Sequence, residues 1–123
     1  ACHKLDEEAL IFAINDGRST ILYANDTGTL PEETWKFIEQ QKIKFDVVSM
    51  DTCRGTLEGD THMGIRENLK MREKLRERNA VKEDTVFYLN HFSHMCGLTP
   101  QEYEHLVSQY GFQLTFDGLS ITV

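Results

Sequence analysis

The sequence has 123 residues, of which 40% are hydrophobic, and this is enough for one domain with one apolar core. Its formal net charge of -7 argues against broad contact with a nucleic-acid backbone or an anionic membrane surface. No apolar run approaches the ~20 residues of a membrane span, and the start of the chain lacks the features of a signal peptide. We therefore expect residues 1–123 to form a single domain with neither a membrane nor a nucleic acid as its partner.

The first half of the chain predicts a hairpin and then a helix. Two β-rich runs, 9–14 and 20–24, are separated by Asp16 and Gly17, a strong turn signal. A helix is expected over 31–41, because a proline suits the first helical position and the two glutamates after it complement the helix dipole.

The second half predicts strands that alternate with helices. An apolar strand at 45–50 is followed by a glycine-rich loop and a long charged helix over about 61–78. The run 85–90 has few polar interruptions, which favours a strand buried on both faces in a parallel region. Thr99 begins a capping box for the next helix, which should end near Gly111.

The last segment, 113–123, predicts a closing hairpin around Asp117 and Gly118. The resulting order, ββαβαβαββ, indicates an α/β fold with one mixed sheet and helices packed on it. Strand patterns lie close to both ends of the sequence and no initiator methionine is present. We expect the chain to be a piece of a longer protein.

The three cysteines, Cys2, Cys53 and Cys96, are widely spaced and form no CxxC motif. An odd number at such spacing argues against a disulfide framework. We expect ordinary thiols in a reducing compartment, and hence a cytoplasmic protein.

Two metal-compatible side chains occur just past predicted strands. Asp26 follows the run 20–24, and His91 follows the run 85–90. Ligands of open α/β sheets bind beyond the carboxyl ends of the strands, so both groups should lie on a common rim. A carboxylate and an imidazole suit Zn, Fe or Mn. On spacing alone, we favour the simpler interpretation, in which Asp26 is a turn residue that bonds its own backbone and His91 is a histidine at a strand end.

His94 and Cys96 follow His91 at the spacing His-x2-His-x-Cys, which raises the alternative of a compact zinc site. A strand-to-turn segment rarely points three such groups at one ion, and a fourth ligand is not evident. We prefer a hydrogen-bonding role for His94 beside His91, and an ordinary thiol for Cys96.

Three short motifs carry a resemblance to a known family. These are YANDTG (23–28), HMG (62–64) and HFSH (91–94), in this order. With the sequence around them, they resemble the C-terminal half of the metallo-β-lactamase superfamily, most closely its cytoplasmic phosphodiesterase-type branch. That branch includes cyclic phosphodiesterases and is related to the tRNA 3′-processing endonucleases. The resemblance covers nearly the whole chain and implies one half of an αβ/βα sandwich.

The resemblance also implies a site. Asp26 is similar to the carboxylate that bridges two metal ions, His91 to the last histidine ligand, and His3 to a separate histidine ligand. His62 is similar to a position that contacts the substrate or assists protonation, so it is the candidate catalytic residue. The implied cofactors are two divalent cations, Zn, Mn or Fe. Asp51, after the strand 45–50, is a candidate to hydrogen-bond a ligating imidazole.

Simpler interpretations remain for the other histidines and for the basic residues. His3 can be a mobile residue near the chain end, and His62 can open a helix capped by Asp60 or Thr61. The basic residues of the helix at 61–78 are interleaved with glutamates, which favours a solvated face over an anion-binding one.

The activity implied by the resemblance is phosphodiester hydrolysis of a small-molecule substrate by a metal-bridging water. The HxHxDH motif of the family is absent, so we expect the isolated chain to be inactive and leave open whether it is an enzyme. The alternative is a non-catalytic metallo-β-lactamase-like module that forms a homo-oligomer to cover its missing half. The same fold also hosts lactam and thioester hydrolysis and flavodiiron redox reactions, which leaves the leaving group undefined.

Overall fold

A computed structural model describes residues 2–4 and 7–123, with side chains for residues 9–94 and 96–123. In this part of the chain the strands are β1 (Cys2–Lys4), β2 (Glu7–Glu8), β3 (Phe12–Asn15), β4 (Thr20–Ala24), β5 (Phe45–Asp51), β6 (Val81–Asn90) and β7 (Gln113–Leu114). The helices are α1 (Glu32–Gln40), α2 (Ile65–Glu77), α3 (Pro100–Ser108) and a short 3-10 helix, η1 (His94–Cys96).

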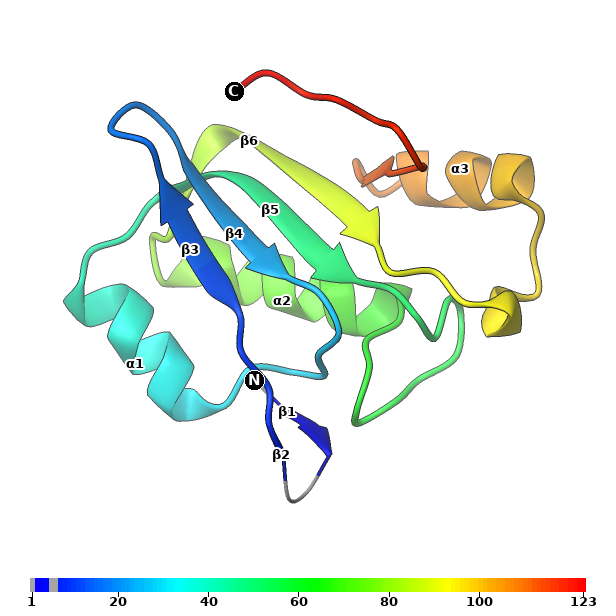
Figure 1. The fold of residues 1–123 in the computed structure, drawn as a ribbon, viewed down its shortest axis with the longest axis horizontal. Helices are drawn as coiled ribbons and strands as arrows, with labels where there is room; N and C mark the ends of the chain where they lie inside the picture. Colours follow the sequence, from blue (N-terminus) through cyan, green and yellow to red (C-terminus); the bar gives the residue numbers. More distant parts are fainter. Residues whose placement is uncertain (1, 5–6) are drawn as a thin grey trace.

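The main sheet is mixed and has the strand order β3-β4-β5-β6-β7 (Figure 1). β3 and β4 form the predicted antiparallel hairpin, in which Phe12 pairs with Tyr23 and Ile14 with Ile21. Each of the other neighbouring pairs is parallel, while β1 and β2 form a separate antiparallel pair. This arrangement confirms the α/β class and the mixed sheet expected from the sequence.

The core lies on one face of this sheet, where α2 crosses behind the strands (Figure 1). Because side chains alternate along a strand, β4, β5 and β6 each send every second residue into this core. The three helices α1, α2 and α3 each add apolar side chains from the face that points toward the sheet. The core includes Leu22, Trp35, Ile38, Val48, Met50, Met71, Leu75, Phe87, Leu89, Tyr103 and Val107.

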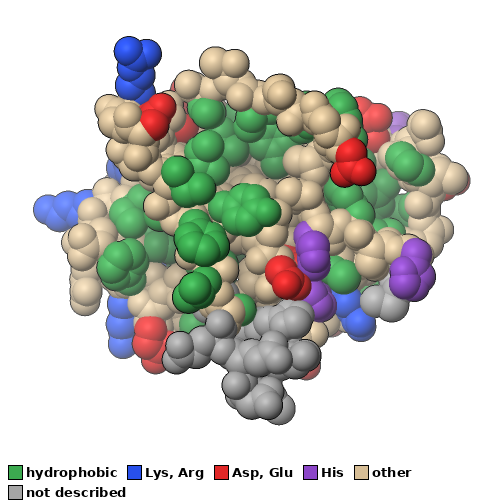
Figure 2. Space-filling view, in the orientation of Figure 1, with side chains coloured by type: hydrophobic (Ala, Val, Ile, Leu, Met, Phe, Trp, Pro, Cys, Tyr) green, Lys and Arg blue, Asp and Glu red, His purple; other side chains and the backbone are tan. Residues whose placement is uncertain are grey.

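The opposite face of the sheet carries apolar side chains without a helix over them in the described part of the chain. Phe12 and Ile14 are 51% and 54% exposed, and their neighbour Tyr23 is 44% exposed. Figure 2 shows hydrophobic side chains gathered over this face. An open apolar face of this kind is typical of a surface that packs against a further layer or another molecule.

Two predicted elements have different boundaries in the structure. β6 begins at Val81, four residues before the predicted strand, because Val81 pairs with Phe45 and the Phe45 N–H donates to the Ala80 carbonyl. α2 begins at Ile65 instead of about residue 61. Gly64 is its N-cap, and the Gly64 N–H donates to Glu67 Oε2 at 3.0 Å.

The closing hairpin predicted for 113–123 is wrong. β7 contains only Gln113–Leu114 and runs parallel to β6, with Leu114 opposite Leu89. The turn at Asp117 and Gly118 does form, because the Leu119 N–H bonds the Phe116 carbonyl at 3.0 Å. The segment after the turn forms no strand and instead lines the open face of the sheet, where Ile121 lies near Ile21 and Tyr88.

A search of the described helices found none that combines the length and the apolar character needed to cross a membrane.

Candidate metal centre

The parallel strands β4, β5 and β6 end at the same edge of the sheet, and each is followed or terminated by a residue that can bind a cation. These residues are Asp26 after β4, Asp51 at the end of β5 and His91 after β6. The Asp26 Oδ1 atom lies 3.8 Å from His91 Nε2. The two side chains that the sequence placed on a common rim are therefore neighbours in the structure.

His62 reaches the same edge from the loop between β5 and α2. The loop is tied down at Met63, the residue after His62, because the Arg54 N–H donates to the Met63 carbonyl and the Met63 N–H donates to Asp51 Oδ1. A Cβ atom on Gly64 would lie 2.3 Å from the Leu57 carbonyl, so only glycine fits where the loop doubles back. His62 Nδ1 consequently lies 3.8 Å from Asp26 Oδ1, and the His62 and His91 ring centroids are 5.5 Å apart.

Asp51 is the centre of this arrangement and is fully buried. Its Oδ2 atom lies 2.8 Å from His91 Nδ1 and 3.1 Å from His62 Nδ1. Backbone N–H groups satisfy the rest of the carboxylate, since Thr27 donates to Oδ2 and Cys53 to Oδ1. A buried carboxylate is tolerated because it is fully hydrogen-bonded, and here it also fixes the segments that carry the other residues.

The contacts of Asp51 determine the orientation of both imidazoles. A carboxylate only accepts hydrogen bonds, so His62 and His91 must each carry a proton on Nδ1. In the neutral tautomer their Nε2 atoms then hold the lone pair that binds a metal ion. The Asp51 carboxylate is therefore positioned for the role expected from the sequence, as the hydrogen-bond partner of a ligating histidine.

The backbone around the two strand-end residues is unusual. Asp26 and His91 have φ angles of 53° and 58°, in the left-handed region that residues with a side chain rarely adopt. Ser49 Oγ bonds Asn25 Oδ1 on one side of Asp26, and Asp51 holds the Thr27 N–H on the other. Such backbone strain persists where the surroundings enforce it and is frequent at functional sites.

Asp26, Asp51, His62 and His91 form one cluster, in which one potential ligand atom of each lies within 4.8 Å of the others. Two ligands of a tetrahedral ion are about 3.4 Å apart, close to the observed separation of Asp26 and His91. Asp51 already accepts several hydrogen bonds, which suits it to orient the imidazoles. The donor set therefore fits one divalent cation held by Asp26 and His91, with His62 beside it.

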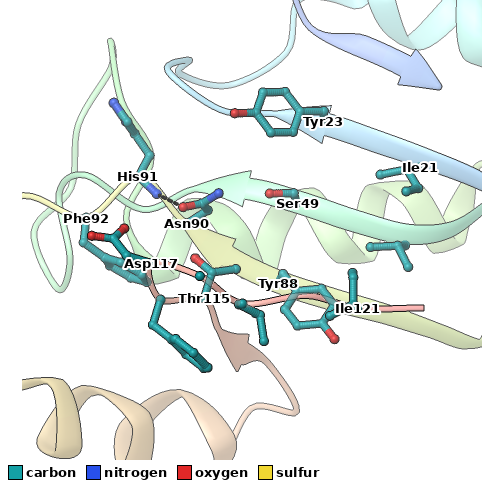
Figure 3. Close-up of a pocket in the computed structure, with 14 residues that line it drawn as sticks. Ile21, Tyr23, Ser49, Tyr88, Asn90, His91, Phe92, Thr115, Asp117 and Ile121 are labelled. Carbon is teal, nitrogen blue, oxygen red and sulfur yellow. Dashed lines mark hydrogen bonds between the residues drawn. The ribbon is translucent and has the colours of Figure 1, made fainter. Parts of the chain in front are cut away.

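A groove leads from this cluster along the open face of the sheet. Its volume is about 620 Å³, and His91 and Asn90 lie at one end. In Figure 3, Tyr23 and Ile21 line one side of the groove, and the C-terminal segment with Asp117 lies on the other. The groove is large enough for a small organic molecule.

The remaining predicted residues have different outcomes. His3 is in β1, but its side chain lies outside the described residues, so its role as a ligand stays a prediction. His94 is exposed at the start of η1, and Cys96 is buried. Among the described side chains, neither belongs to a cluster that could hold a metal ion, which argues against the compact zinc site at HFSHMC. Among the described contacts, the hydrogen-bond partner of the His91 imidazole is Asp51, and His94 does not have this role.

The helix-cap interpretation of His62 is wrong in its details. The residue lies three positions before α2, and Gly64 with Glu67 caps that helix in place of Asp60 or Thr61. Sequence reasoning also missed Cys53, which lies within reach of both imidazoles. Its position two residues after Asp51, at the same strand end, was the available signal.

The fold and the cluster together define a mixed α/β protein whose architecture is consistent with half of a metallo-β-lactamase-like fold. A solved structure of a new diphosphatase from the PhnP family matches with a TM-score of 0.62 and 20% sequence identity. The match covers 93% of this chain and 42% of the diphosphatase chain. No family model and no curated protein matches the sequence. At this identity, the likeness establishes the fold.

Proposed function

We propose that the chain is the C-terminal portion of a dinuclear metal-dependent hydrolase that cleaves phosphodiesters. The observation that carries this proposal is the convergence of Asp26, His62 and His91 around the buried Asp51 carboxylate. The similarity of the fold to a diphosphatase supports it. The bound divalent cations would supply Lewis acidity and an activated water at this edge of the sheet.

The side chains of this chain would have distinct roles. The Asp26 carboxylate, which is 60% exposed at the strand edge, would hold the cations. His91 would bind through Nε2, because its Nδ1 faces Asp51. His62 is oriented by the same carboxylate, so its Nε2 atom would contact the substrate, and in the imidazolium form it would give its Nε2 proton to the leaving oxygen.

Two cations require more ligands than the described side chains provide. The second ion would depend on an HxHxDH motif outside this sequence, and on His3 if its side chain reaches the site. We therefore propose that the 123-residue chain alone is inactive, and that its sheet packs on a complementary half that carries the remaining ligands.

The complete product of the encoding gene tests this function. It should hydrolyse bis(p-nitrophenyl) phosphate in the presence of Mn²⁺ or Zn²⁺ and lose this activity in EDTA, whereas the 123-residue chain should show no turnover above background. A gene product without an upstream HxHxDH motif, or one without metal-dependent phosphodiesterase activity, would contradict the proposal.

A non-catalytic module that assembles with itself is the second candidate, and the open face of the sheet favours it. Phe12, Ile14 and Tyr23 are neighbours on this face and are about half exposed. An apolar patch of this kind promotes association. A second copy would bury it face to face, as the two sheets of a sandwich do.

Gel filtration with light scattering distinguishes a monomer from such a homo-oligomer. We expect a dimer or larger species, and we expect Phe12→Lys to shift it to a monomer by placing a charge in the contact. Leu57→Lys is the matched control, because Leu57 is equally exposed, at 52%, but lies in the loop before α2. A monomeric wild-type chain would rule out this covering role.

A further inference from the structure

Cys53 belongs to a second group of ligand-type side chains. One potential ligand atom each from Cys53, His62 and His91 lies within 4.8 Å of the other two. The thiol is half-buried and not in a disulfide. The resemblance to metal-dependent hydrolases assigns no role to this cysteine, and the proposed hydrolase mechanism does not use it.

The backbone around Cys53 is held firmly. Its N–H donates to Asp51 Oδ1 at 2.9 Å, and its carbonyl accepts a hydrogen bond from Ser93 Oγ at 2.7 Å. The first contact ties the Cys53 backbone to the carboxylate that orients both imidazoles, and the second ties it to the segment that follows His91. The three donors are thus positioned by one hydrogen-bond network.

The spacing of the three donors is compatible with binding of one ion. Two ligand atoms on a tetrahedral zinc ion are about 3.4–3.6 Å apart. A separation of at most 4.8 Å therefore requires only small side-chain rotations to reach coordination. Three protein ligands would leave the fourth position for water.

We propose that Cys53, His62 and His91 form a binding site for one thiophilic divalent cation, such as Zn²⁺, Co²⁺ or Cd²⁺. Sulfur and imidazole donors select these ions, whereas a carboxylate-based site also takes Mn²⁺. Among the described side chains, no cluster contains both Cys53 and Asp26. Both groups contain His62 and His91. An ion bound by Cys53 and the two histidines therefore prevents a second ion from binding to Asp26 and the same histidines at the same time. The proposal does not require that the chain be part of a hydrolase.

Titration of the reduced 123-residue chain with Co²⁺ tests this site. Binding should produce a sulfur-to-cobalt charge-transfer band that saturates at one equivalent. Cys53→Ser should abolish the band, whereas Cys96→Ser and Cys2→Ser should keep it. Asp26→Asn should also keep it, since Asp26 is not a ligand in this arrangement. Absence of the band from the wild type, or its survival in Cys53→Ser, would overturn the proposal.

A second measurement does not depend on the folding of a variant. Zn²⁺ should slow the alkylation of Cys53 by iodoacetamide by about tenfold or more, because a metal-bound thiolate is a poor nucleophile. Equal rates with and without Zn²⁺ would contradict the site. Mn²⁺ binding, followed by electron paramagnetic resonance, separates this result from the proposed function. If Mn²⁺ binds in a manner that depends on Asp26 but Co²⁺ produces no sulfur-to-cobalt band, the Cys53 site is overturned and the proposed function is not.

Discussion

Asp51→Asn should lower the free energy of unfolding by about 3 kcal/mol, which we expect to be the largest effect of any substitution at the site. The carboxylate is fully buried and accepts hydrogen bonds from three segments of the chain. An amide keeps the size of the side chain but loses one acceptor oxygen and places an N–H₂ group against donors. The donors to Asp51 are the backbone N–H groups of Thr27, Cys53 and Met63 and the Nδ1 atoms of His62 and His91.

Urea denaturation followed by circular dichroism measures this loss, and Asp26→Asn is the matched control. Asp26 is 60% exposed, and asparagine tolerates its φ of 53°, so the control should change stability by less than about 0.5 kcal/mol. If both variants unfold at the same urea concentration, Asp51 does not organise the site.

Asp26→Asn should instead lower the affinity of the chain for Mn²⁺ by about 100-fold or more, since even the loss of a residue that only orients a ligand costs 10–100-fold. The substitution removes the carboxylate charge next to His91 Nε2 and retains the backbone conformation. Isothermal titration calorimetry of the two proteins gives the ratio of the dissociation constants.

Asp117→Asn is the control for this loss of charge. Asp117 is an exposed carboxylate that lines the same groove but, among the described side chains, is not part of a metal-ligand cluster. It should change Mn²⁺ affinity by less than about twofold, because exposed charges away from an ion are screened. Equal losses in both variants would mean that Mn²⁺ responds to the overall negative charge and not to a site.

The sequence was sufficient to predict the elements whose patterns are strong. The Asp16-Gly17 turn gave the β3-β4 hairpin, and the apolar runs gave β5 and most of β6. It also placed Asp26 and His91 on one rim, because the ends of parallel strands share an edge. These features depend on local turn chemistry and on strand alternation, which a single sequence records.

Features that depend on tertiary pairing were not predictable. The predicted strand begins only at residue 85, but pairing of Val81 with Phe45 extends β6 through the charged residues that precede it. The apolar residues after Gly118 have a strand pattern, yet in the structure they line the open face of the sheet. In both places, long-range contacts override the local propensity.

The arrangement of the site was only partly predictable, for a similar reason. Asp51 was recognised as a candidate partner of one imidazole, whereas its simultaneous contact with His62 depends on a loop conformation that the sequence does not encode locally. The left-handed backbone at Asp26 and His91 is likewise visible only in the structure. Sequence motifs therefore identified the ligand candidates, and the structure supplied the carboxylate that organises them.

Anomalous X-ray diffraction from crystals of the chain grown with Mn²⁺ tests the central claim most directly, namely that Asp26 and His91 together hold a divalent cation. We predict one anomalous peak within coordinating distance of the Asp26 carboxylate and of His91 Nε2, with Nδ1 still bonded to Asp51. A Mn²⁺ peak that touches neither Asp26 nor His91, or no peak at a concentration that saturates the protein in calorimetry, would contradict the account.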